Sequence, residues 1–300
     1  MTGEHLEITH GPASAVVNIV GAGLRAFEVG GVPYAETYAD EPPMGAGSVL
    51  VPWPNRVAGA TWSLGGETYT LEVTEPSRGH AIHGLVRHAR WSVVSQQDGS
   101  VTLGVAVDSA PGWPFPFYTT ISYALSDTGL TITHTVENRG DREMPHGVGT
   151  HPYPSPGKTD VDECALTLAA GTVLPVDPES LIPNGAPIDV TGTDYDFRPG
   201  RPVRDVELDT AFGGCEPGAD GLVRNSLRSA TGVGVEVWAE PVFKWVQVFT
   251  TPDFPGKTTR AVAIEPMTCP PDALNSGEDL LWLKPGESWA GRWGITPLGA

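Results

Sequence analysis

Apolar residues alternate with small or polar residues along much of this chain, with a period of two. The pattern is clearest in Val101–Val107, Thr119–Leu125 and Leu130–Val136, and turn residues such as Ser126–Gly129 separate these segments. A period of two places successive side chains on opposite faces of a strand. The three segments therefore predict an antiparallel meander.

The same strand character continues on both sides of this meander. Ala60–Leu64 and Glu67–Leu71 flank Gly65–Gly66, and a Gly-Gly pair supplies the positive φ angles of a hairpin turn. Further strands are expected at Ala15–Val20, Leu24–Val29, Val161–Leu168, Gly232–Trp238, Trp245–Thr250, Ala261–Glu265 and Glu287–Gly294. Short helical turns are expected only around Ser180–Ile182 and near Asp272–Leu274.

Glycine and proline are abundant and evenly spread. The 300 residues include 37 Gly and 29 Pro, which together exceed the usual share of about 12%. Such a density of helix breakers excludes a helix-rich fold and indicates many turns between short strands. β-Sandwiches of this length often form one unit, and no linker or repeat is visible. We predict an all-β fold, a large antiparallel β-sandwich, as a single domain over residues 1–300.

Charge and cysteine content narrow the class of protein. A net charge of −18 argues against nucleic acid or anionic membrane as a partner, since both need basic patches. Cys164, Cys215 and Cys269 are widely spaced, which predicts free thiols and no structural zinc site. The N-terminal sequence lacks a signal-peptide pattern, and no apolar run reaches membrane-spanning length. We expect a soluble, cytoplasmic protein.

Two ionisable residues lie in rigid surroundings. Glu265 is expected to be the last residue of a strand that stops at Pro266, beside an irregular loop. His151 lies between a glycine-rich segment and Pro152, a frame that holds an imidazole in one pose, as a general acid requires. The alternatives are a surface carboxylate at a strand end and a histidine that caps a turn.

Three other polar residues are candidates for ligand contact. Arg56 lies in an aromatic, proline-rich loop, and a guanidinium binds oxygen-rich ligands through a rigid fork of donors. His83 follows an apolar pair and precedes a glycine, and Asp209 lies between apolar neighbours. The alternatives are a surface ion pair, a satisfied core histidine and a turn cap. Most of the nine tryptophans are expected in the core, although such rings also stack on sugars.

The chain resembles the aldose 1-epimerase (galactose mutarotase) family over nearly its whole length. The resemblance rests on five segments in order: Asn55–Arg56–Val57, Ile82–His83–Gly84, Thr150–His151–Pro152–Tyr153, Leu208–Asp209 and Ile264–Glu265–Pro266. The segment EPMTCPPDALNSG is similar to the family's Glu-containing loop. The family's fold is a large antiparallel β-supersandwich, which agrees with the strands expected above.

The resemblance implies an isomerase that interconverts sugar anomers without a cofactor or metal. Glu265 would be the general base and His151 the general acid. Sugar contacts would come from Arg56, His83, Asp209, Gln247 and, less strongly, Asn55. Tyr153 is considered only as a wall of the pocket. We also hypothesise that Asp209, if it lies near His151, raises the pKa of that imidazole.

Two motifs depart from the family pattern. This chain has Thr-His-Pro-Tyr-Pro where many members have Asn-His-x-Tyr-x-Asn, and Ile-His-Gly-Leu where they have Leu-His-Gly-Gly. The choice among glucose, galactose and other aldoses therefore stays open. The oligomeric state, monomer or homodimer, also stays open.

Other functions are weighed on the same residues. An epimerase of a phosphorylated or sulfonated sugar would need basic groups, and Arg87, His88 and Arg90 are the nearby cluster, for which a solvated turn is preferred. A non-catalytic sugar-binding protein would not need both an acid and a base. A hydrolase would need Asp209 as its second carboxylate and would leave His151 without a role.

Overall fold

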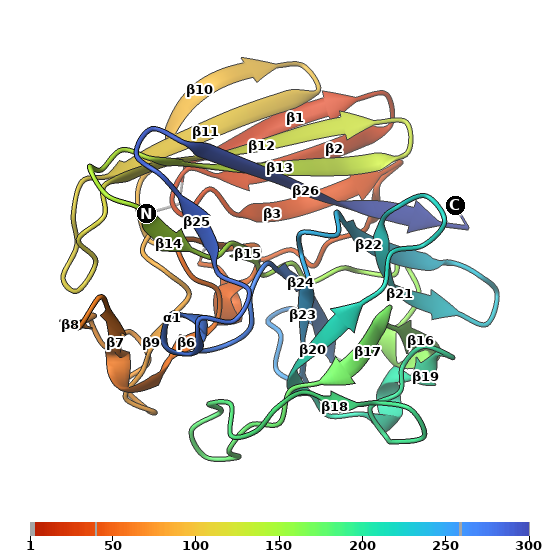
Figure 1. The fold of residues 1–300 in the computed structure, drawn as a ribbon. Coiled ribbons are helices and arrows are strands. Elements are labelled where there is room, and N and C mark those ends of the chain that lie inside the picture. Colours follow the sequence, from red (N-terminus) through yellow and green to blue (C-terminus); the bar gives the residue numbers. More distant parts are fainter. Residues whose placement is uncertain (1–3, 40, 258–259, 300) are drawn as a thin grey trace.

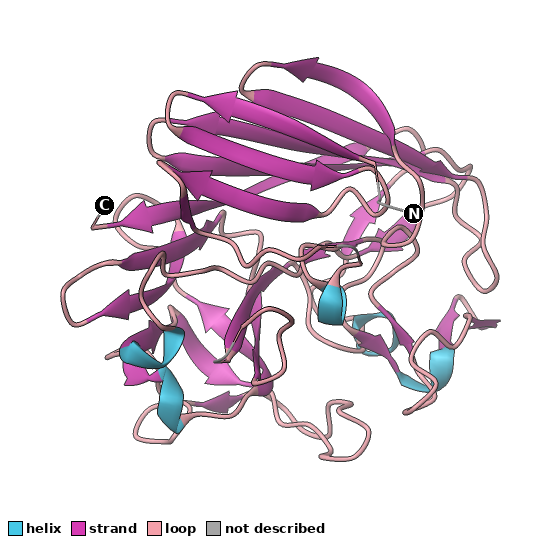
Figure 2. Ribbon diagram, turned by 180° about the vertical axis from the view of Figure 1, so that it is seen from behind, coloured by secondary structure: helices cyan, strands magenta, loops and turns pink. Residues whose placement is uncertain are grey.

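The computed structural model describes residues 4–39, 41–257 and 260–299. Strands dominate these residues, and helices are limited to a few short turns (Figure 2). The paired strands run antiparallel in both large sheets. The prediction of an all-β, antiparallel fold is confirmed. No helix in the described ranges is long and apolar enough to span a bilayer.

The largest sheet contains the predicted meander. Its nine strands lie in the order β10 (Ser92–Gln97), β11 (Ser100–Val107), β12 (Phe117–Ser126), β13 (Gly129–Asn138), β26 (Ser288–Leu298), β22 (Gly234–Ala239), β21 (Val223–Ser229), β16 (Cys164–Thr167) and β19 (Arg201–Pro202). The C-terminal strand β26 lies between β13 and β22 (Figure 1). The sheet therefore joins segments that are far apart in the sequence.

A second sheet, below the first in Figure 1, carries most of the site described later. Its seven strands have the order β18 (Ile188–Asp189), β17 (Ala170–Val173), β20 (Asp209–Cys215), β23 (Trp245–Thr251), β24 (Ala261–Met267), β15 (Gly149–Thr150) and β5 (Val49–Leu50).

Smaller elements complete the fold. The four-stranded sheet consists of β1 (His5–His10), β2 (Ala13–Asn18), β3 (Leu24–Val29) and β4 (Val32–Pro33). The two-stranded pairs are β14 (Met144–His146) with β25 (Leu281–Leu283), β6 (Arg56–Val57) with β9 (Ala81–Ile82), and β7 (Thr61–Leu64) with β8 (Glu67–Thr70). The helical turns are α1 (Ala273–Ser276) and 3₁₀ turns at Pro43–Gly45, Ala58–Ala60, Val161–Glu163 and Val203–Asp205.

The main hydrophobic core joins the large sheets. On β23, Val246 and Val248 belong to this core together with Ile264 of β24 and Ile121 of β12. Because side chains alternate along a strand, Gln247, between the two valines, points to the other face of the sheet. That face is polar at its centre, and it forms the floor of the site.

The structure corrects the expected course of the strand that carries Glu265. Strand β24 does not stop at Pro266 but continues to Met267, and Pro266 pairs with Val246. On the opposite side, the amides of Ile264 and Thr268 donate to Pro152 and Val148. Since amide directions alternate along a strand, the proline removes one bond from this side only. Glu265 is therefore held inside a strand with neighbours on both sides.

Two other expectations differ in detail, and a third is confirmed. Residues 178–180 form a turn, not the helical turn expected around Ser180–Ile182. The segment expected as a strand from Val161 begins as a 3₁₀ turn, and its strand covers Cys164–Thr167. The helical turn near Asp272–Leu274 is present as α1. Pro and Gly signals identify an irregular backbone, but tertiary contacts decide which turn it adopts.

Candidate active site

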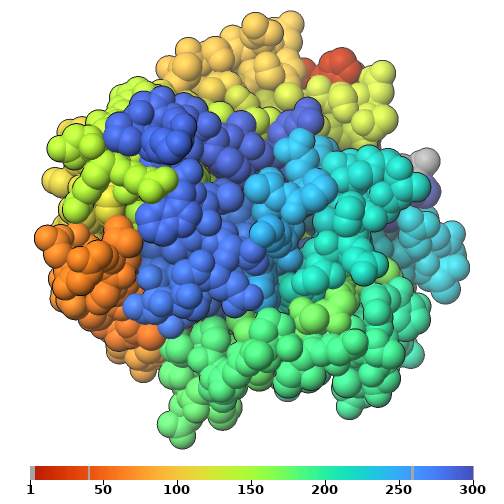
Figure 3. Space-filling model, in the orientation of Figure 1, coloured from red at the N-terminus to blue at the C-terminus, as the bar shows by residue number. Residues whose placement is uncertain are grey.

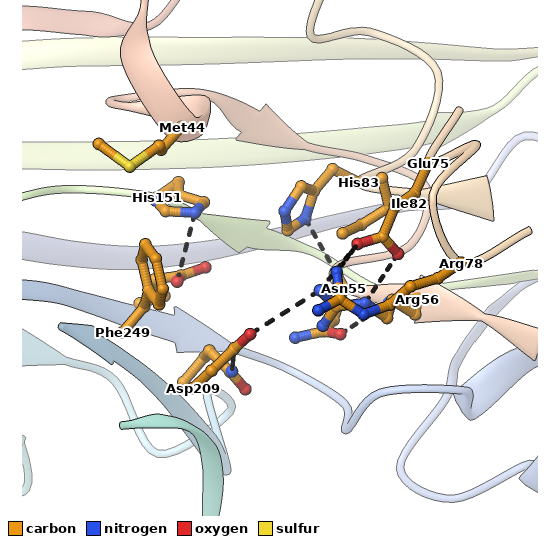
Figure 4. A pocket seen from close by; sticks show the side chains of 12 residues that line it. Met44, Asn55, Arg56, Glu75, Arg78, Ile82, His83, His151, Asp209 and Phe249 are labelled. Carbon is orange, nitrogen blue, oxygen red and sulfur yellow. Dashed lines mark hydrogen bonds and ion pairs between the residues drawn. The ribbon is translucent and has the colours of Figure 1, made fainter. Parts of the chain in front are cut away.

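A cavity of about 360 Å³ opens on the polar face of the seven-stranded sheet (Figure 4). All seven residues predicted for catalysis or sugar contact line it. Its lining consists of Met44, Asn55, Arg56, Glu75, Arg78, Ile82, His83, His151, Asp209, Gln247, Phe249 and Glu265. The fold thus gathers side chains that lie as far apart in the sequence as Met44 and Glu265.

Strand register places three of the polar groups together. Gln247 of β23 lies opposite Glu265 of β24, and Asp209 at the start of β20 lies opposite Phe249. The Gln247 Nε2 amide donates to Asp209 Oδ1 at 2.7 Å. Gln247 and Glu265 are nearly inaccessible to solvent, whereas Asp209 is half-buried. Adjacent strands therefore fix the floor of the cavity.

His151 is held from several sides. Its amide donates to Ser48 O at 3.1 Å, and its carbonyl accepts from Gly47 N at 2.8 Å. The Tyr153 ring stacks on the imidazole at 5.3 Å, and a Cβ at Gly45 would lie 3.1 Å from His151 Cδ2. The expectation of Tyr153 as a pocket wall is wrong, because Tyr153 packs on His151 and is not among the described residues that line the cavity.

His151 and Glu265 face each other. The Nε2 and Oε1 atoms are 3.4 Å apart, and the side chains are 7% and 2% exposed. Within the described residues, His151 Nδ1 and Glu265 Oε2 have no hydrogen-bond partner. Nε2 and Oε1 therefore face one another at the cavity, whereas Nδ1 and Oε2 are buried without a partner among the described residues.

Burial shifts the pKa values of His151 and Glu265 in the directions that favour the neutral form of each side chain. It lowers the pKa of His151 to about 4. Burial, with Asp209 adding to it and Arg56 opposing it, raises the pKa of Glu265 well above its ordinary value. The hypothesis that Asp209 raises the pKa of His151 is wrong. Asp209 instead raises the pKa of Glu265, a like charge on β24 that is separated from β20 by β23.

His83 and Asn55 form a second fixed pair. The Asn55 amide donates to His83 Nδ1 at 3.2 Å, and the His83 amide donates to Asn55 O at 2.9 Å. Because Nδ1 accepts a backbone proton, the neutral ring carries its own proton on Nε2. Burial and the nearby His151, Arg87 and Arg56 lower the pKa of His83 well below its usual range. His83 is thus a neutral hydrogen-bond donor at the cavity.

Arg56 is the centre of a charged cluster. Its Nε and Nη2 donate to the two Glu75 oxygens at 2.9 and 3.0 Å, and its Nη2 is 3.8 Å from Asp209 Oδ2. Arg78 Nη1 donates to Glu75 Oε1 at 3.0 Å. Sequence reasoning missed Glu75 and Arg78, which lie in a proline-containing turn without strand or motif signals.

Met44, Ile82 and Phe249 form the apolar part of the lining and were also missed. Met44 lies over His151 at the end of the cavity opposite Arg78 (Figure 4). Phe249 follows Gln247 by two residues on β23, so strand alternation was a signal that could have found it.

Other chemistry finds less support at this position. Arg87, His88 and Arg90 are absent from the described lining, and Arg90 instead pairs with Glu4. The described residues contain no group of three or more His, Cys, Asp or Glu side chains arranged to hold a metal ion. What the cavity does offer is an acid–base pair at one end and fixed hydrogen-bond donors and acceptors across its floor.

Comparison with known proteins gives a consistent result. The family model described as aldose 1-epimerase matches residues 4–296. The Escherichia coli (strain K12) protein named uncharacterized protein YihR is 31% identical over 290 residues, covering 95% of this chain and 91% of that protein. An aldose 1-epimerase of the same organism is 31% identical over 170 residues, which cover 54% of this chain and 47% of that enzyme.

Solved structures agree in fold. A galactose mutarotase-like protein from Clostridium acetobutylicum superposes with a TM-score of 0.86 and 21% identity, covering 98% of this chain and 95% of that one. A putative aldose 1-epimerase from Escherichia coli K12 gives a TM-score of 0.82 and 22% identity, with 98% of each chain covered. At such identities the likeness shows a common fold.

Proposed function

The chain belongs to the aldose 1-epimerase family, and on this premise we propose that it interconverts the α and β anomers of a free aldose such as glucose or galactose. The observation that carries the proposal is the buried contact between His151 and Glu265 at 3.4 Å. Anomer interconversion needs one proton removed and one proton delivered on the same sugar, and this pair supplies both functions.

Ring opening uses the two residues together. Glu265 takes the proton of the C1 hydroxyl while His151 protonates the ring oxygen, so the C1–O5 bond breaks and an open-chain aldehyde forms. Rotation about C1–C2 presents the other face of the carbonyl to the C5 hydroxyl. Ring closure then reverses the two proton transfers and restores the starting protonation state. Each positioned acid or base contributes about 10²- to 10⁴-fold.

The remaining polar residues hold the sugar. His83 Nε2–H and the Arg56 guanidinium donate hydrogen bonds to hydroxyl oxygens, and Asp209 accepts from hydroxyl groups. The side-chain amides of Gln247 and Asn55 flank these groups and provide further hydrogen-bonding atoms for the sugar. Phe249 offers an apolar surface to the C–H face of the ring. Together they keep C1 and O5 beside the acid–base pair.

The charge balance of the cavity supports a neutral sugar. Both arginines that line it already pair with Glu75. Three carboxylates line the same space, namely Glu75, Asp209 and Glu265. An anionic phosphate or sulfonate would have to compete with Glu75 for its arginine, whereas hydroxyl groups use the existing hydrogen-bonding atoms.

Optical rotation tests the activity. Freshly dissolved α-D-glucose and α-D-galactose are followed with and without the protein at equal pH and buffer concentration. We expect the approach to equilibrium to be faster with protein and proportional to its concentration. Unchanged rates for both sugars would reject the free-hexose function. Phosphorylated and sulfonated sugars, and a sugar-binding titration, would then separate an anionic substrate from binding without catalysis.

A further inference from the structure

Among the described residues, the Arg56 guanidinium donates hydrogen bonds to the Glu75 carboxylate and has a longer contact with Asp209. The carboxylate accepts from Arg56 through both oxygens, at 2.9 and 3.0 Å, and the two side chains are 13% and 9% exposed. A two-bond carboxylate–guanidinium pair fixes the plane of the guanidinium as well as its position. Arg56 thus reaches the sugar from a pose that Glu75 defines.

Glu75 is itself held rigidly. Its carbonyl accepts from the amides of Arg78, Gly79 and His80, which closes a tight turn. The buried ring of His80 ends this turn by accepting from Gly59 N through Nδ1 at 3.0 Å. Burial opposes ionisation of Glu75, but the bonds and charges of Arg56 and Arg78 outweigh it and lower its pKa. The carboxylate is therefore a fixed anion.

A loop from another part of the chain supports the same turn. Arg78, which donates to Glu75, also donates through Nε to Glu179 O at 3.1 Å, and His80 Nε2 lies 3.2 Å from Ser180 O. Asp177 Oδ1 closes this loop by accepting from the Ser180 amide and hydroxyl. In Figure 3 the green surface of this region borders the orange surface at the lower left.

We propose that Glu75 is a positioning residue for Arg56, and that the turn of residues 75–80, supported by the loop of residues 177–182, sets how tightly the sugar binds. The proposal rests on the proposed function for its sugar, but the geometry of the pair does not depend on which sugar binds. Glu75 touches no reacting atom in this account and acts through Arg56.

A double-mutant cycle tests the coupling. Anomer interconversion is measured for the wild type, Glu75→Gln, Arg56→Lys and the double variant. Glu72→Gln is the matched control, an exposed carboxylate three residues upstream. We expect Glu75→Gln to raise KM about 10-fold with kcat changed less than about 3-fold, since a uniform binding contact is loosened. The double variant should be no more than about 2-fold worse than Arg56→Lys, because the two changes remove one interaction.

Additive effects in this cycle, or a Glu75→Gln variant that matches Glu72→Gln, would overturn the proposal. Glu75→Asp provides the rescue test, since it keeps the charge on a shorter side chain. We expect its KM to lie between the values for Glu75→Gln and the wild type. If Glu75→Gln does not fold, as judged by circular dichroism, the comparison is made with Glu75→Asp. No recovery by Asp in a folded series would also contradict a charge-based positioning role.

A second measurement separates this proposal from the proposed function. The Nε–H signal of Arg56 is identified by NMR through its loss in Arg56→Lys. We expect slow exchange with water in the wild type and in Glu72→Gln, and exchange at least about 10-fold faster in Glu75→Gln, because the bonded proton is released. If no aldose is converted, the proposed function fails, and this comparison still decides the positioning. An Arg56 signal unchanged in Glu75→Gln would reject it.

Discussion

His151 Nε2 lies 3.4 Å from Glu265 Oε1, with both side chains almost fully buried. The neutral pair, with a protonated Glu265, and the ion pair, with a protonated His151, contain the same single proton. Burial favours the neutral arrangement, as the opposite directions of the two pKa shifts indicate. The proposed mechanism uses the ion-pair form, in which His151 rather than Glu265 holds the proton.

The first prediction concerns the acid limb of the pH profile. As the pH falls through about 4, the pKa of His151, this imidazole takes up a proton and the pair then holds two. Below that pH, neither group is left to accept the C1 hydroxyl proton. We expect kcat/KM to fall about tenfold per pH unit below about pH 4, since kcat/KM reports the free enzyme. A limb near pH 6.5, the ordinary value for histidine, would show that the pKa of His151 is not lowered.

Asp209→Asn tests which residue Asp209 influences. The Asp209 charge raises the pKa of Glu265, so its removal should lower that pKa and shift the alkaline limb of kcat/KM to lower pH. The acid limb should stay in place. KM should also rise, because Asp209 is a proposed sugar contact. Movement of the acid limb alone would restore the coupling to His151 that the structure argues against.

Glu265→Gln should stabilise the protein while it removes activity. The folded-state pKa of Glu265 is raised, so its contribution to stability is lost as the pH rises above the ordinary value of 4.5. The side-chain amide in Glu265→Gln does not ionise and makes no such pH-dependent contribution to stability. We expect the variant to be more stable than the wild type by about 1 kcal/mol near pH 7, a gain typical of removing a strained functional group. The difference in thermal midpoint should grow from pH 5 to pH 7.

No growth of this difference with pH, in thermal melts of the two proteins side by side, would mean that Glu265 is not held with a raised pKa. The melts are compared from pH 5 to pH 7, above the His151 pKa of about 4.

Gly45→Ala should disturb His151 directly. A Cβ there would lie 3.1 Å from Cδ2 of the imidazole, and Gly45 has φ of +76°. Gly192 has φ of +73° with no atom within 4 Å of the added Cβ, so Gly192→Ala carries the backbone strain alone. We expect both variants to lose about 1 kcal/mol of stability. Only Gly45→Ala should lose kcat, by about 10-fold or more, since catalysis depends on fixed geometry.

An equal loss of kcat in Gly45→Ala and Gly192→Ala would indicate a general effect of strain. Unchanged kcat in Gly45→Ala would mean that the imidazole has room to shift without consequence.

The strand content and the polar site residues on the strands could be predicted from the sequence. Trp245–Thr250 was expected as a strand, and the resemblance to a known family identified Gln247 within it. The course of β24 through Pro266 was not predictable, because whether a proline ends a strand depends on which neighbour its missing amide would face.

The charged cluster and the pKa directions could not be predicted for related reasons. Arg56 and Glu75 meet because β6 pairs with β9, a contact between short strands that leave little periodic signal. The effect of Asp209 on Glu265 depends on the register of neighbouring strands, and the shift of His151 depends on burial. Neither quantity is encoded in local spacing.

The most direct test of the central claim measures anomer exchange and sugar binding on the same samples. Magnetisation exchange between the α and β C1 protons of the aldose is recorded by NMR with the wild type, Glu265→Gln and His151→Asn. Sugar affinity is measured alongside by calorimetry. We expect each variant to lose at least about 100-fold in exchange rate, with affinity changed by less than about 10-fold. Exchange at the wild-type rate in either folded variant would contradict the assignment of the acid–base pair.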